Sequence, residues 1–479
     1  MARSATIPIV PVASVAPPSP RSPLATTFLG RLGEAMRRHR RVILAIQWVV
    51  IVVYVGLVTV PAFMPLPETG ATIVSNLTLA AQFAFWGIWW PFVIFTTLFA
   101  GRVWCGVFCP EGALAEHVSR FGLNRRVPKF IRWSGWPFVA FILTTVYGQL
   151  VSVYEYAQAA LLVLGGSTLA AIAVGFLYGR EKRVWCRYLC PVSGVFSLLG
   201  RVAPLQFKVD RQLWREHRPN FRLECAPLVD VKGMTGSSDC HLCGQCSGFR
   251  EAVHLTARLP GSEVARLPDG EVSKWDARLV VFGMLGVAVG AFQWSSSPWF
   301  VMVKQALAEW LVERNWFGPL ESDIPWWVLT HYPEAGDVFT WLDGGLVLGY
   351  IGSMALVLGS WISLWLAVAG RITATAGESW HHAARRLAYT LTPLAGLGIF
   401  LGLSALTVTL LKAEGLRFPW LGSARGVVLA IGVLWSLGLA WRQLHHRKAP
   451  LPRLAAALAC VAVALAPVAA SWMLLFYVW

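Results

Sequence analysis

Nine long apolar stretches limit what this chain can fold into more than any other feature. Each holds about 20 predominantly apolar residues, enough for a helix to cross the ~30 Å hydrocarbon core of a bilayer. Because the runs are continuous and do not alternate with polar residues, a transmembrane β-barrel is excluded. The runs lie at 42–64, 76–100, 134–153, 158–178, 277–295, 344–369, 387–411, 425–441 and 454–479. The sequence therefore predicts an all-α polytopic membrane protein with about nine transmembrane helices.

The basic residues give these helices an orientation. The net charge is +16, and Lys and Arg gather in the first 41 residues, in the 101–133 loop and after the eighth run. Alternate connections enriched in this way follow the positive-inside rule, whereas a nucleic-acid-binding protein would carry one continuous basic patch. We therefore expect a bacterial inner-membrane protein with a cytoplasmic N-terminus and a periplasmic C-terminus. The expected surroundings are the lipid bilayer, and no nucleic acid is expected as a partner.

The polar and apolar stretches divide the chain into four parts. Residues 1–41 are rich in Pro and Arg and are predicted to be a disordered basic cytoplasmic tail. Residues 42–194 form a four-helix membrane module, and the motif "RVWC" occurs in it twice, at 102 and at 183. Such self-similarity indicates an internal duplication of two helical hairpins. Residues 195–276 are predicted to be a cytoplasmic insert, and 277–479 a five-helix C-terminal membrane module.

The insert contains the first candidate metal site. "CHLCGQC" places Cys240, Cys243 and Cys246 in the C-x2-C-x2-C spacing that opens a bacterial-type iron–sulfur binding run. Arg250 stands where the fourth cysteine of that run would be, so Cys225, 15 residues upstream of Cys240, is the candidate fourth ligand. We expect a [4Fe–4S] cluster in a small ferredoxin-like insert. A tetrahedral zinc site remains an alternative, as does a three-cysteine cluster with an open iron.

The duplicated motif supplies the second candidate site. It occurs as "WCGVFCP" and "WCRYLCP", with cysteines at 105, 109, 186 and 190. Residues four apart share one face of an α-helix, so each pair would be half of a four-ligand site. Pro110 and Pro191 suit the first position of a new helix, which would bend the chain after each pair. The two halves could meet at the cytoplasmic membrane surface to hold a second iron–sulfur cluster; a redox-active dithiol, or cysteines that pack beside the first cluster, are the alternatives.

Three arginines accompany the duplicated motif. Arg102, Arg183 and Arg187 could offset the negative charge of a thiolate-ligated cluster and raise its potential. They could equally be ordinary residues of the positive-inside pattern.

These motifs resemble those of the membrane-bound ferredoxin family of NapH, NosR, MauN and CcoG. The resemblance rests on the doubled "WC-x3-CP" followed by "CHLCGQC" and covers roughly residues 76–260. It implies a multi-helix membrane protein with iron–sulfur clusters on the cytoplasmic face, which passes electrons from quinol toward periplasmic reductases or takes part in metalloenzyme maturation. This sequence has one ferredoxin-type run where the family usually has two, and an additional five-helix module.

Three further features of the sequence are the histidines, the tetrapeptide at 69–72 and the isolated Cys460. Haem is not expected, because C-x-x-C-H is absent and no histidine falls within the predicted spans. "TGAT", 69–72, is similar to sequences that attach FMN to the last threonine, but we expect Thr72 to lie in an ordinary loop. Cys460 is predicted to be a small buried side chain within the last span.

The sequence contains no acid, base or nucleophile constellation, so no catalytic residues are assigned. Cofactors would carry the redox chemistry while the protein positions them. We expect electrons to pass between quinol or a cytoplasmic donor and a membrane or periplasmic redox partner, as in a quinol dehydrogenase subunit. The alternative is an accessory or maturation factor that reduces or handles a metal for a respiratory metalloenzyme. A permease is disfavoured by the near absence of charged residues within the last five runs.

Overall fold

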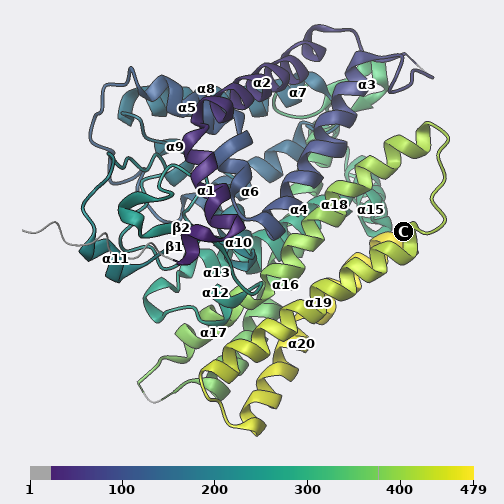
Figure 1. Cartoon of the computed structure of the whole chain (residues 1–479). Helices are drawn as coiled ribbons and strands as arrows, with labels where there is room; N and C mark the ends of the chain where they lie inside the picture. The colour runs from purple at the N-terminus through teal and green to yellow at the C-terminus, as the bar shows by residue number, and fades with distance from the viewer. Residues whose placement is uncertain (1–22, 69, 376) are drawn as a thin grey trace, which may run out of the picture.

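The protein is described by a computed structural model that covers residues 23–68, 70–375 and 377–479 (Figure 1). Within these residues, eight helical segments are long and apolar enough to cross a membrane. The all-α membrane architecture is thereby confirmed. The eight segments are Arg40–Phe63, Leu77–Ala100, Ala157–Tyr178, Lys274–Ser296, Trp341–Thr373, Trp380–Ala413, Leu421–His446 and Leu451–Val478.

The ninth expected span, 134–153, is a shorter helix. Here α6 (Trp136–Leu150) has 15 residues, a length of about 22 Å, less than the hydrocarbon core of a bilayer. The turn that follows it begins at Val151, whose N–H donates to Tyr147 O. The number of nine spans therefore stays a prediction.

Loops from distant parts of the sequence meet at one end of the helices, which we call the far side. Ile73 N donates to Glu414 Oε1 (2.6 Å), and Tyr156 OH donates to Asp337 Oδ2 (2.9 Å). The short antiparallel strands β3 (His331–Tyr332) and β4 (Asp337–Val338) lie in one of these loops. The opposite end carries the insert and is called the cysteine side.

Most of the spanning segments contain more than one helical element. Wide π-helical turns interrupt three of them within the bundle, at η3 (Phe83–Trp89), η5 (Leu161–Gly165) and η8 (Leu279–Val287), and such turns often mark functional sites. The α-helices of the segments are α2 (Arg40–Thr59), α3 (Leu77–Gln82), α4 (Trp90–Ala100), α7 (Ala157–Ala160), α8 (Gly166–Tyr178), α13 (Lys274–Arg278), α14 (Ala288–Gln293), α16 (Trp341–Thr373), α17 (Trp380–Ala388), α18 (Thr392–Ala413), α19 (Leu421–His446) and α20 (Leu451–Met473).

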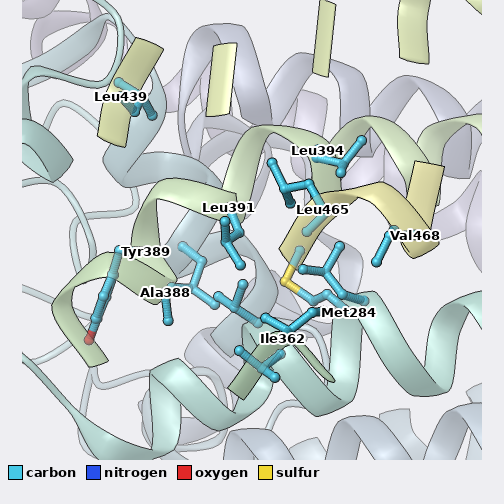
Figure 2. Packing of buried hydrophobic residues seen from close by; sticks show 14 of the residues in the cluster. Met284, Ile362, Ala388, Tyr389, Leu391, Leu394, Leu439, Leu465 and Val468 are labelled. Carbon is cyan, nitrogen blue, oxygen red and sulfur yellow. The ribbon is translucent and has the colours of Figure 1, made fainter. Parts of the chain in front are cut away.

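One continuous apolar core joins the N-terminal and C-terminal helices. Met284 of η8, Ile362 of α16, Leu394 of α18 and Leu465 of α20 point toward one another in it (Figure 2). Small residues let the helices approach closely, since a Cβ built on Gly286 would lie 2.8 Å from the Ala355 Cα. The membrane part is thus a single packed bundle, and the two modules expected from the sequence share its core.

The insert starts later than the predicted residue 195. The helix α10 (Ser193–Val202) is buried almost throughout and packs against α4, so it belongs to the bundle. The insert proper contains α11 (Arg211–Glu216) and an antiparallel pair, β1 (Leu205–Val209) with β2 (Val253–Ala257). Apolar side chains near Val202, at the end of α10, are more favourably buried against the neighbouring helix than exposed in a polar insert.

The predicted disordered tail, 1–41, is wrong in its second part. Residues 1–22 lie outside the described part of the chain, but Phe28–Arg38 form the helix α1. Thr27 caps this helix by accepting from Gly30 N (3.1 Å). A Cβ built on Gly33 would lie 3.0 Å from the Leu255 Cβ of β2, so α1 is held by packing against the insert, which the composition of the tail did not reveal.

Candidate metal centres

Four cysteines of the duplicated motif come together in one group, which we call the membrane quartet. Cys190 interacts electrostatically with the three others. The sulfurs of Cys109 and Cys186 lie 3.6 and 3.4 Å from a Cβ built on Gly112, so the two copies of the motif face one another. The quartet consists of Cys105, Cys109, Cys186 and Cys190.

The chain bends within each copy of the motif, and the predicted continuous α-helix is wrong. In the first copy, Cys105 lies in the π-helical turn η4 (Trp104–Phe108), whereas Cys109 has an extended backbone and caps α5 (Pro110–Ser119). The Cys109 sulfur accepts from Gly112 N (3.4 Å). Pro110 occupies the first position of α5, as predicted. The bend turns both thiols toward one centre. A straight helix would instead place the two thiols one above the other along its axis.

The second copy differs in its proline. The helix α9 (Val184–Tyr188) ends before Cys190, and α10 begins at Ser193. Pro191 therefore lies in the turn between them, and its predicted place at the start of a helix is wrong. Ser193 stabilises this turn, since its hydroxyl donates to Cys186 O (2.7 Å).

The first copy of the motif is followed by a helix that packs beside a membrane-spanning segment, and the predicted position of the quartet at the membrane surface stays a prediction. After Gly101, whose φ of +68° reverses the chain, α5 packs along α8. Thr168 of α8 donates to Glu111 Oε1 (3.5 Å), and Glu111 lies two residues after Cys109. Thr168 precedes the helix end at Tyr178 by ten residues, or about 15 Å, so Glu111 lies beside the interior of this helical segment and not at its end.

The cysteines of the insert form a second group, the insert quartet, made of Cys225, Cys240, Cys243 and Cys246. Cys246 interacts electrostatically with the other three. Left-handed residues wrap the loop around them, with φ of +50° at Leu242 and +78° at Gly244. Glycine is required at 244, because a Cβ there would lie 2.6 Å from the Met36 Cβ of α1. The upstream cysteine that the sequence suggested thus lies beside the run of three.

The two quartets are in direct backbone contact. A Cβ built on Gly106, next to Cys105, would lie 2.1 Å from His241 O and 2.9 Å from Cys243 N. Gln47 of α2 holds this segment in place by donating to Gly106 O (3.0 Å), and both groups are buried. Redox centres bound in the two quartets would therefore be neighbours.

The contact at Gly106 leads to a prediction. Gly106→Ala should separate the insert from the membrane quartet, because the added methyl group overlaps the main chain at His241. We expect loss of bound iron and faster proteolysis of the insert, measured by metal analysis and limited trypsin digestion. Gly56→Ala in α2 is the matched control, since nothing lies within 4 Å of its added Cβ; equal iron in both variants would contradict the contact.

The three arginines singled out in the sequence lie between the quartets. Arg183 is 2% exposed, its Nε donates to Glu116 Oε2 (2.8 Å), and it also donates to Cys105 O. It interacts electrostatically with Cys186 and Cys243, one from each quartet. Glu116 had no sequence pattern to reveal it, since its role depends on a partner 67 residues away.

The other two arginines hold the loop before the insert quartet. Arg102 is buried and donates to Ser238 O (2.7 Å) and to Ser193 Oγ (3.0 Å). Arg187 forms an ion pair with Asp239 (2.5 Å). Positive charge is thus concentrated where the segments of the two quartets meet.

The donors fit a positively charged metal centre. Burial raises the pKa of Cys225 to about 11 and that of Cys240 to about 12, so these thiols are neutral at pH 7 unless a metal replaces their protons. Burial and the three arginines hold the pKa of His241 well below its usual value. A metal cation would replace these protons and balance the negative charge of the thiolates that bind it.

A separate trio of acidic and histidine side chains lies outside the two quartets. Among the described residues, only Asp269, Glu378 and His382 bring three ligand atoms within 4.8 Å of one another. The two carboxylates of the trio are already paired with Arg386 and Arg447, so that trio is an ion-pair network.

Two weaker candidates have ordinary surroundings. Thr72 lies in a far-side loop, where its N–H donates to Ser75 Oγ (2.9 Å); Thr69, the first residue of "TGAT", lies outside the described residues. Cys460 is 7% exposed in the middle of α20 and packs in the apolar core.

Comparison with known proteins places the duplicated motif in a family. The 4Fe-4S binding domain family matches residues 82–128 and 161–212. Each match contains one copy of the motif, with Cys105 and Cys109 or with Cys186 and Cys190. The two matches thus follow the two copies of the duplicated motif, and neither includes the insert quartet.

Curated relatives are similar to about a third of the chain or less. Regulatory protein NosR of Pseudomonas aeruginosa is 26% identical over 179 residues, 33% of this chain and 25% of NosR. Protein NirI of Paracoccus denitrificans is 27% identical over 191 residues, 33% of this chain and 26% of NirI. The methylamine utilization ferredoxin-type protein MauN of the same organism is 25% identical over 143 residues, 26% of this chain and 50% of MauN. The chain thus spans about a quarter of the first two relatives, and no solved structure matches it.

Proposed function

Because the chain belongs to a membrane-bound ferredoxin-type family, we propose that it passes electrons through two [4Fe–4S] clusters, one in each cysteine quartet. A membrane iron–sulfur protein with an electron-transfer or redox-accessory role is the common ground with its relatives. The proposal of two neighbouring clusters rests on the contact of Gly106 with the backbone at His241 and Cys243. It brings the two sets of four thiols together, with Arg183 between them.

The residues of the chain act by position and charge. The eight thiolates would hold iron, which supplies the one-electron chemistry. Arg102, Arg183 and Arg187 would stabilise the more negative, reduced state of the centres, and burial would exclude water. Electrons would enter from quinol or a cytoplasmic donor and leave to a membrane or periplasmic redox partner, in an inner-membrane protein whose N-terminus is cytoplasmic.

Metal and spectroscopic analysis tests this function. Protein purified without oxygen should contain about eight iron and eight acid-labile sulfide per chain, as two [4Fe–4S] clusters require. Reduction should produce an EPR spectrum with two interacting centres. Stoichiometric zinc without iron would overturn the proposal.

An accessory role in metalloenzyme maturation is the second candidate. The observation that favours it is that one similar protein, NosR of Pseudomonas aeruginosa, is named a regulatory protein. Deletion of the gene separates the two functions. A partner enzyme that is fully metallated but receives no electrons supports the conduit, whereas an undermetallated partner supports the accessory role.

A further inference from the structure

A row of aromatic side chains leads away from the membrane quartet toward the far side. Trp104, the residue before Cys105, packs on Trp89 with ring centres 5.2 Å apart. Trp89 packs on Phe85 (5.8 Å), and Phe85 on Trp86 (4.9 Å). The row ends at Tyr154, which meets Trp86 at 4.6 Å.

Three different segments contribute to this row. Phe85, Trp86 and Trp89 all belong to the π-helical turn η3, in the middle of a membrane-spanning segment. Tyr154 lies in the far-side turn after α6, where its carbonyl accepts from Gln82 Nε2 (2.6 Å). The row therefore connects the buried thiols with the opposite face of the bundle.

A cavity of about 680 Å³ opens beside Tyr154 at the far-side end of the row. Its wall contains aromatic rings, among them Trp294 and Phe339, together with two cations, Lys412 and Arg425, and two acids, Glu155 and Asp337. The Arg425 guanidinium lies 4.3 Å from the Phe476 ring centre. Its volume and its mixed lining of aromatic and charged side chains are those of a small-molecule site, and they fit a flat aromatic electron carrier with polar groups at its edge.

We propose that Trp104, Trp89, Phe85, Trp86 and Tyr154 form an electron path between the membrane quartet and a one-electron acceptor in the far-side cavity. The path rests on the proposed function, because it needs a redox centre at the quartet. Electron transfer rates fall steeply with distance and with gaps between atoms. Packed rings leave few gaps between the atoms along the row, and the row starts at Trp104, next to Cys105 of the membrane quartet.

The path can be tested in sealed membrane vesicles with only the far side exposed. This sidedness is checked by labelling Val74→Cys, at a position 95% exposed on the far side, with an impermeant maleimide. The centres are reduced without oxygen, excess reductant is removed, and impermeant ferricyanide is added outside. Each ferricyanide takes one electron from a reduced centre and becomes ferrocyanide, with no bond made or broken. We expect rapid loss of the reduced EPR spectrum in the wild-type protein.

Substitution at Trp89 should interrupt the path. Trp89→Leu should slow reoxidation from the far side several-fold, Trp89→Phe should slow it less, and reoxidation from the cysteine side should not change. Trp365→Leu in α16, another partly buried tryptophan of the same core, is the control. A second readout is the broadening of the reduced EPR spectrum by a dysprosium chelate added outside, which should be equal in all variants if the centre stays in place.

The outcomes separate the path from the proposed function. Normal iron content with no far-side reoxidation, or equal rates for wild type and Trp89→Leu, would overturn the path alone. Absence of iron in the wild-type protein would overturn the proposed function and the path with it.

Discussion

Cys243→Ala is expected to lower bound iron and acid-labile sulfide to about half, from eight to four per chain. The Cys243 sulfur belongs to the insert quartet, where it interacts with Cys240 and Cys246. Cys186→Ala should remove the other half, because Cys186 belongs to the membrane quartet. The variants should retain different EPR spectra, since one centre lies in the insert and the other within the bundle. Metal analysis and EPR of anaerobically purified protein give the measurement.

Cys460→Ala is the matched control for both variants. Cys460 is a buried cysteine of α20 that belongs to neither quartet, and its loss should leave iron and sulfide at the wild-type level. If both quartet variants lost all iron together, a single shared centre would replace the two-centre proposal. If neither lost iron, the quartets would not be ligands.

Arg183→Gln is expected to destabilise the protein and to lower the midpoint potential of both centres. Glu116 is 7% exposed and would keep a buried charge without its main partner, which costs about 3–5 kcal/mol in other proteins. Reduction adds negative charge to a centre, so loss of a nearby cation makes reduction less favourable. The potential should therefore become more negative. Thermal unfolding in detergent and a potentiometric EPR titration measure the two effects.

The control variants distinguish charge from packing. Arg183→Lys keeps the charge but cannot make the paired contact with Glu116 and Cys105 O, so it should preserve more of the potential than of the stability. Arg126→Gln, at an exposed position, should change neither quantity. An unchanged potential in Arg183→Gln would show that this guanidinium does not act on the centres.

The sequence by itself determined the membrane class and the grouping of cysteines into two sets of four. Apolar runs of spanning length have one stable solution in a bilayer, because every backbone polar group must be satisfied within the segment. The duplication was likewise visible, since "RVWC" occurs twice at equivalent helix ends. The eight long helices among the described residues confirm the membrane class, and the two matches to the 4Fe-4S binding domain family support an iron–sulfur protein. The assignment of the eight cysteines as ligands stays a prediction.

Only the tertiary structure decided how the two sets are placed. Three contacts join residues that are distant in the sequence. They are the packing of α5 against α8, the contact at Gly106 and the ion pair of Arg183 with Glu116. The spacing of apolar residues in the sequence predicts a single helix, whereas these contacts depend on how several helices pack against one another. The same holds for α1, whose composition resembles a disordered tail but which is ordered by burial of Gly33 against Leu255. The packing of several elements against one another decides where the thiols lie and which residues surround them. No single segment of the sequence contains this information.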